Sequence, residues 1–124
     1  MSVNGVIYLC GVHSIAFALF HAAFWRLFRW RTELARVGRP TRAIVQILNL
    51  RLIHVFLGIG IVCFVFPEEL AGTPLGRALL LLMALFWVGR TIEQLVFLRI
   101  DHPLVHGLTA AFVLGAGLFA LPLL

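Results

Sequence analysis

The longest apolar run of the chain, residues 43–66, is long enough to cross a bilayer as one helix. It contains Gln46, Asn49, Arg51 and His54, and lipid disfavours each of these side chains by up to a few kcal/mol when it has no partner. At about 100° per residue, Gln46, Asn49 and His54 share one broad face of the helix, and Arg51 lies at its edge. We therefore expect this face to point into a helix bundle and to meet polar partners there.

The composition indicates a membrane protein. Of the 124 residues, 62% are hydrophobic and only 12% are charged, and the mean hydropathy is +1.06. These values lie outside the range of soluble domains. We predict a single all-α integral membrane domain, a bundle of four transmembrane helices at about residues 3–25, 43–66, 75–98 and 104–124. The formal charge of +5 flanks these spans, so it indicates membrane topology and not nucleic-acid binding.

The distribution of arginine predicts the orientation in the membrane. Six arginines lie between Arg26 and Arg42, and Arg99 follows the third span, whereas the second connection has only Arg77. Because basic residues accumulate in cytoplasmic loops, we expect the first and third connections in the cytoplasm and both termini on the non-cytoplasmic side. A multi-pass protein of a bacterial inner membrane fits this pattern. The arginines are also able to touch anionic lipid headgroups, although the positive-inside signal alone accounts for them.

Turn residues mark the connections between the spans. Thr41 follows a Gly-Arg-Pro turn and is expected to cap the second helix. Residues 67–74 contain two prolines and two acids and are expected to form a short loop. Asp101 or His102 is expected to cap the fourth helix, with Pro103 in its first turn.

The first span carries a stripe of aromatic side chains with two histidines. Within roughly 100° of arc the stripe contains Cys10, His13, Phe17, Phe20, His21, Phe24 and Phe28. Two interpretations are open. The stripe is either a packing face with hydrogen-bonded histidines, or the wall of a pocket for a planar cofactor or ligand.

The histidines permit haem binding. At a rise of 1.5 Å per residue, His13 and His54 lie about 16–20 Å from the cytoplasmic edge, near the middle of the bilayer. A b-type haem requires two axial imidazoles on facing helices at matched depth, and the sequence positions of these two residues meet that requirement. Together with His21 on the aromatic stripe, they are the candidate cofactor-binding residues. Simple packing with a hydrogen-bond partner for each imidazole is the alternative.

A second group of polar side chains defines a candidate ligand pocket. Asn49, Arg51, Arg90, Glu93 and Gln94 lie at about 5–13 Å from the cytoplasmic edge. Glu93 is the only carboxylate within a span and has two potential arginine partners. Two arginines against one carboxylate leave room for an anion, a headgroup or a carbonyl-bearing ligand such as a quinone. Alternatively, the network only holds the second and third helices together.

Signatures of soluble enzymes are missing, so the sequence does not decide whether the protein is an enzyme. There is no glycine-rich phosphate loop and no recognisable Ser-His-Asp arrangement. His102 and His106 share one helical face, but no cysteine or carboxylate pair joins them, and we predict no metal site.

Three functions are compatible with this pattern. The leading hypothesis is a membrane protein that binds a ligand or cofactor, haem or quinone most concretely, in the cytoplasmic half of the bundle. The first alternative is a small transporter or channel that forms a homo-oligomer through the small-residue seam of Gly107, Ala111 and Gly115. The second alternative is an accessory or anchor subunit of a larger membrane complex, in which the polar groups only specify packing.

Overall fold

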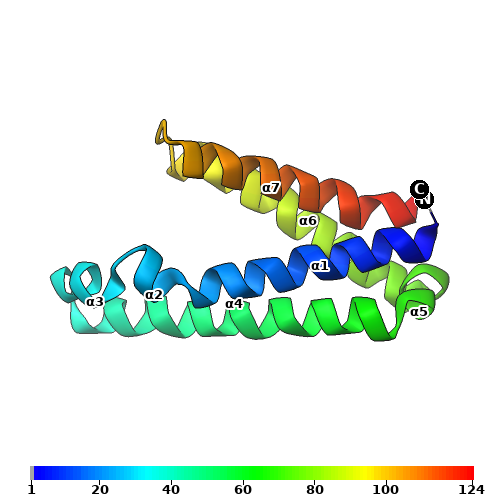
Figure 1. The fold of residues 1–124 in the computed structure, drawn as a ribbon, viewed down its shortest axis with the longest axis horizontal. Coiled ribbons are helices and arrows are strands. Elements are labelled where there is room, and N and C mark those ends of the chain that lie inside the picture. Colours follow the sequence, from blue (N-terminus) through cyan, green and yellow to red (C-terminus); the bar gives the residue numbers. More distant parts are fainter. Residues whose placement is uncertain (1) are drawn as a thin grey trace. The chain divides into compact units, whose positions relative to one another are not determined.

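The computed structural model describes residues 2–124, and all regular structure in that part is helical (Figure 1). Four segments are long and apolar enough to cross a membrane, which indicates a multi-pass membrane protein and confirms the predicted all-helical class. They are α1 (Val3–Ala22), α4 (Arg39–Val65), α6 (Pro74–Phe97) and the segment Pro103–Leu123, which comprises α7 (Pro103–Ala120) and the short η2 (Leu121–Leu123). The connections contain α2 (Phe24–Leu27), α3 (Trp30–Glu33), η1 (Leu34–Arg36) and α5 (Pro67–Gly72).

The helix boundaries differ from the predicted ones at two connections. The expectation that Thr41 caps the second helix is wrong, because α4 already begins at Arg39. Proline is tolerated in the first turn of a helix, where its missing N–H has no intrahelical partner, so Pro40 does not interrupt the start of α4. The predicted loop at residues 67–74 contains the six-residue helix α5.

The start of the fourth span agrees with the prediction. α7 begins at Pro103, and the Nδ1 atom of His102 accepts a hydrogen bond from the backbone N–H of Leu104 at 3.1 Å. The imidazole thus supplies the partner that the first turn of a helix lacks.

The chain divides into two compact units. Unit 2 comprises residues 11–62, and unit 1 comprises the remaining residues on either side of it. In unit 2, α1 and α4 lie side by side and run antiparallel (Figure 1). The ring of Phe17 lies 6.0 Å from that of Phe56. Beyond the end of α1, the indole of Trp25 in α2 meets Gln46, nearer the start of α4.

Gly60 allows α1 and α4 to approach closely within unit 2. A Cβ atom at this position would lie 2.7 Å from Cγ1 of Ile15 and 3.3 Å from the carbonyl oxygen of Gly11. The absence of a side chain here therefore sets the distance between the two helices.

In unit 1, α6 and α7 pack against each other and also run antiparallel. Trp87 of α6 stacks on Phe112 of α7 with ring centroids 5.5 Å apart. At the start of α6, the Arg77 guanidinium donates hydrogen bonds to the carbonyl oxygens of Pro122 at 3.3 Å and Leu123 at 2.9 Å. These bonds satisfy carbonyl groups that the end of a helix leaves without partners.

The first residues of the chain also belong to unit 1. The thiol of Cys10 donates to the carbonyl oxygen of Leu118 at 3.2 Å, and Tyr8 stacks on Phe64 with ring centroids 6.0 Å apart. Cys10 and Cys63 are both buried and carry no disulfide.

Thr73 and Gly76 shape the turn between α5 and α6 in unit 1. Thr73 caps α6 by accepting a hydrogen bond from the N–H of Gly76 at 3.0 Å, and its hydroxyl donates to the Glu69 carbonyl at 2.7 Å. A Cβ atom at Gly76 would lie 2.7 Å from the carbonyl oxygen of Leu70, and closer still to other backbone atoms of α5. Only glycine fits at this position.

We predict that Gly76→Ala destabilises the protein by about 1–3 kcal/mol or more, because the added methyl group meets backbone atoms that cannot move aside. Thermal unfolding in detergent measures the change. Gly72→Ala, in the same turn, is the control, since a Cβ atom there has nothing within 4 Å. Equal unfolding temperatures for the two variants would contradict the close approach of α5 to α6.

Candidate functional site

The interior of unit 2 contains a two-way hydrogen-bonded pair between α1 and α4. The side-chain oxygen of Asn49 lies 2.8 Å from Nδ1 of His21, and the amide nitrogen of Asn49 donates to the His21 carbonyl oxygen at 2.9 Å. Because a carbonyl oxygen only accepts, this geometry puts the imidazole proton on Nδ1. Asn49 is only 4% exposed. Asn49, on the polar face expected on the second span, therefore has a polar partner on α1, whereas His54 of the same predicted face is exposed.

A second pair of polar side chains lies one turn closer to the start of α4. The indole N–H of Trp25 donates to the side-chain oxygen of Gln46 at 3.0 Å. The amide nitrogen of Gln46 donates to the Arg42 carbonyl oxygen at 3.1 Å. The amide of Gln46 is thus held from both sides and fixes the indole of Trp25 in place.

The aromatic stripe forms a chain of ring contacts. The imidazole of His13 lies 4.9 Å from the ring of Phe17, and Phe56 lies 6.0 Å from Phe17 and 5.3 Å from His21. His13 is buried, whereas His54 is exposed. Since Phe56 follows His54 by two residues, the two side chains point about 200° apart on α4. Unit 2 therefore does not bring the imidazoles of His13 and His54 together.

Three of the predicted pocket residues come together in unit 1. The Arg90 guanidinium lies 3.6 Å from the carboxylate of Glu93, which confirms the expected ion pair, and donates to the side-chain oxygen of Gln94 at 3.3 Å. It also lies over the ring of Phe112, 4.5 Å from the centroid. The buried Gln94 donates in turn to the Val105 carbonyl oxygen at 3.3 Å.

The other two predicted pocket residues, Asn49 and Arg51, belong to unit 2. Asn49 is buried in the pair with His21, whereas Arg51 is exposed on α4. The pairing of Arg51 with Glu93 stays a prediction. The ion pair of Glu93 with Arg90 is weak in water, because both side chains are more than one third exposed.

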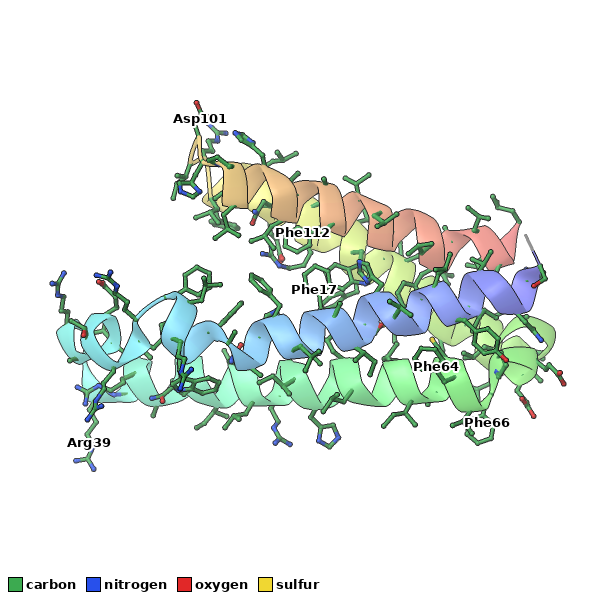
Figure 2. The ribbon with its side chains drawn as sticks, in the orientation of Figure 1. Phe17, Arg39, Phe64, Phe66, Asp101 and Phe112 are labelled. Carbon is green, nitrogen blue, oxygen red and sulfur yellow. The ribbon has the colours of Figure 1, made fainter. Side chains whose placement is uncertain are left out.

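The histidines near the start of α7 have separate roles. His102 caps the helix, while the Nε2 atom of His106 lies 2.8 Å from the carboxylate of Asp101 in the turn between α6 and α7 (Figure 2). Among residues 2–124, no group of three or more His, Cys, Asp or Glu side chains is arranged to hold a metal ion.

The predicted small-residue seam does not lie on one uniformly exposed face of α7. Gly107 is exposed, with nothing within 4 Å of an added Cβ atom, whereas Ala111 is half-buried and Gly115 is buried. Homo-oligomerisation through this seam stays a prediction.

Sequence reasoning missed a pocket that forms around the first connection of unit 2. It is an open hollow of about 430 Å³, and we name it the arginine–tryptophan pocket. The available signal was Trp25 and Trp30 beside the clustered arginines, a pattern that is typical of a membrane interface and by itself predicts no pocket. The pocket is lined by Trp25, Arg26, Trp30, Arg31, Leu34, Ala35, Arg42 and Gln46.

The backbone at Arg29 shapes this pocket. Arg29 adopts a left-handed conformation with φ of 51°, which is uncommon for a residue other than glycine. The chain turns there between α2 and α3, so that the ring of Trp30 packs 5.2 Å from that of Trp25 and 5.6 Å from that of Phe24. Arg42 ties the connection to α4 by donating from Nε to the Leu34 carbonyl oxygen at 3.0 Å.

The lining of the pocket is strongly basic. It contains the guanidinium groups of Arg26, Arg31 and Arg42 and no carboxylate. The nearest acid in the sequence, Glu33, is outside the lining and lies 4.0 Å from the guanidinium of Arg36. The pocket can therefore donate several hydrogen bonds to a ligand and favours a ligand with negative charge.

No protein family, curated protein or solved structure matches this chain.

We predict that Asn49→Leu destabilises the protein by about 1–3 kcal/mol, because it removes both hydrogen bonds between the Asn49 side chain and His21. Thermal unfolding in detergent measures the loss. Leu50→Ala is the control, since Leu50 is an exposed neighbour on the same helix. If Asn49→Leu unfolds at the wild-type temperature, the pair does not hold α1 to α4.

Proposed function

We propose that the chain is a multi-pass membrane protein that binds an amphiphilic ligand in the arginine–tryptophan pocket, on the cytoplasmic side of a four-helix bundle with both termini outside. The observation that carries this proposal is the open, basic hollow lined by two indoles, three guanidinium groups and the amide of Gln46. The excess of arginine in the first connection supports the cytoplasmic placement.

The lining suits a ligand with a polar head and an apolar tail. Guanidinium groups donate hydrogen bonds to carbonyl or phosphate oxygens, and indole rings are well suited to the boundary between headgroups and acyl chains. A quinone head or a lipid head meets this description. The geometry favours haem less, because unit 2 leaves His13 and His54 on different sides of its helices.

Tryptophan fluorescence tests ligand binding in this pocket. Two of the three tryptophans, Trp25 and Trp30, line the pocket, whereas the third, Trp87, is buried in unit 1. We expect a short-chain quinone or a short-chain phospholipid to change the fluorescence saturably. The change should be strongly reduced in Trp30→Phe and retained in Trp87→Phe. If neither probe changes the fluorescence of the pocket tryptophans, the proposed function is wrong.

A second candidate is a subunit of a larger membrane complex, and the exposed face of α4 favours it over a transporter. Arg51 lies about 12 Å beyond Ala43, where the apolar part of this helix begins, and His54 is one turn further on. Both are exposed. An arginine that faces lipid inside the span costs up to about 3 kcal/mol, so a protein partner with a carboxylate is the expected cover for this face.

Native mass measurement in mild detergent tests the second candidate. We expect an assembly larger than one chain, and we expect Arg51→Leu to dissociate it because the partner's carboxylate loses its counter-ion. Leu50→Ala, on the same exposed face, should leave the assembly intact. An Arg51→Leu variant of unchanged mass with a raised unfolding temperature would show that Arg51 has no such partner.

A further inference from the structure

We infer that the arginine–tryptophan pocket recognises the phosphate of an anionic lipid headgroup. This inference rests on the proposed ligand-binding function and deepens it by naming the class of ligand. It concerns only residues of unit 2.

The charge of the pocket selects an anion. Three arginines, Arg26, Arg31 and Arg42, line one hollow, and no acidic residue in the lining offsets their charge. A neutral ligand such as a quinone would leave this charge uncompensated. A phosphate compensates it and accepts the paired hydrogen bonds that a guanidinium group donates.

Donor groups remain available for such a ligand. Arg42 donates from Nε to the Leu34 carbonyl oxygen at 3.0 Å and from one terminal nitrogen to the Val37 carbonyl oxygen at 3.5 Å. Three of its five N–H groups are left over. Within residues 2–124, no ion pair or hydrogen bond occupies the guanidinium groups of Arg26 and Arg31.

The pocket lies at the height along α4 where a headgroup is expected. The apolar part of the helix begins at Ala43, between the two residues of α4 that line the pocket, Arg42 and Gln46. Exposed apolar side chains follow at once, at Ile47 and Leu48, and offer a surface for acyl chains. A lipid fits both the basic hollow, with its headgroup, and the apolar surface beside it, with its acyl chains. Free phosphate fits only the basic hollow.

The hollow is also preorganised. The Trp25 indole is held by its hydrogen bond to Gln46, and the left-handed backbone of Arg29 places Trp30 against Trp25. Strained backbone of this kind concentrates at ligand sites. A pocket built around such a residue differs from a basic segment that only accumulates near anionic lipid.

The test uses the full-length protein in detergent and follows tryptophan fluorescence with three probes. These are short-chain phosphatidylglycerol, short-chain phosphatidylcholine and inorganic phosphate. We expect saturable binding of phosphatidylglycerol, with phosphatidylcholine much weaker. If inorganic phosphate alone saturates the site as tightly, the phosphate chemistry holds and its source is the free ion; if it acts only weakly, the source is the lipid.

Matched double variants separate the pocket from the general charge of the segment. Arg26→Gln with Arg31→Gln removes two charges from the lining, whereas Arg36→Gln with Arg39→Gln removes two charges outside it. Figure 2 shows Arg39 at the start of α4 with its side chain extending away from the helix. At about 1 kcal/mol per arginine, the first variant should weaken phosphatidylglycerol binding by about tenfold or more, and the control should leave it nearly unchanged.

Two results would overturn the inference. Equal weakening in both double variants would show that the lipid senses only the charge of the segment. Binding of the short-chain quinone without binding of phosphatidylglycerol or phosphate would leave the proposed function standing and reject an anionic ligand. Circular dichroism checks that both double variants remain folded.

Discussion

The hydrogen bonds of Asn49 are the interaction on which unit 2 depends. In a lipid environment a polar group has no water to bond with, so it must find its partner inside the protein. A single amide of α4 satisfies both the imidazole and the backbone carbonyl of His21 on α1. That requirement sets the register of the two helices, and the contacts of Phe17 with Phe56 and of Trp25 with Gln46 follow from it.

The same requirement explains the polar contacts of unit 1. Gln94 is buried and bonds to the Val105 carbonyl, so one amide again ties two antiparallel helices together. At the other end of α6, Arg77 bonds to carbonyl groups after the end of α7. The Arg77 guanidinium therefore donates hydrogen bonds to carbonyl oxygens at the end of a neighbouring segment, where the backbone offers no donors for them.

The arginines fall into two classes, and the difference has functional consequences. Arg42, Arg77 and Arg90 each have carbonyl, amide or carboxylate partners within their own unit. Arg31 lines a pocket without a carboxylate, and Arg51 is exposed on α4 inside an apolar span. A charge without an internal partner needs one from outside, so the second class marks where a ligand or a partner protein is expected to bind.

The sequence by itself determined the all-helical class, the four apolar segments and a cap from Asp101 or His102 at the start of α7, because apolar length and local turn chemistry suffice for these features. It also indicated that Asn49 needs a polar partner. Only the tertiary structure decided which partner: it paired Asn49 with His21 and turned His54 to another side of α4. The arginine–tryptophan pocket could not be predicted from the sequence either, because it depends on the left-handed backbone at Arg29. Nothing in the sequence around Arg29 predicts that conformation, which is uncommon for a residue other than glycine.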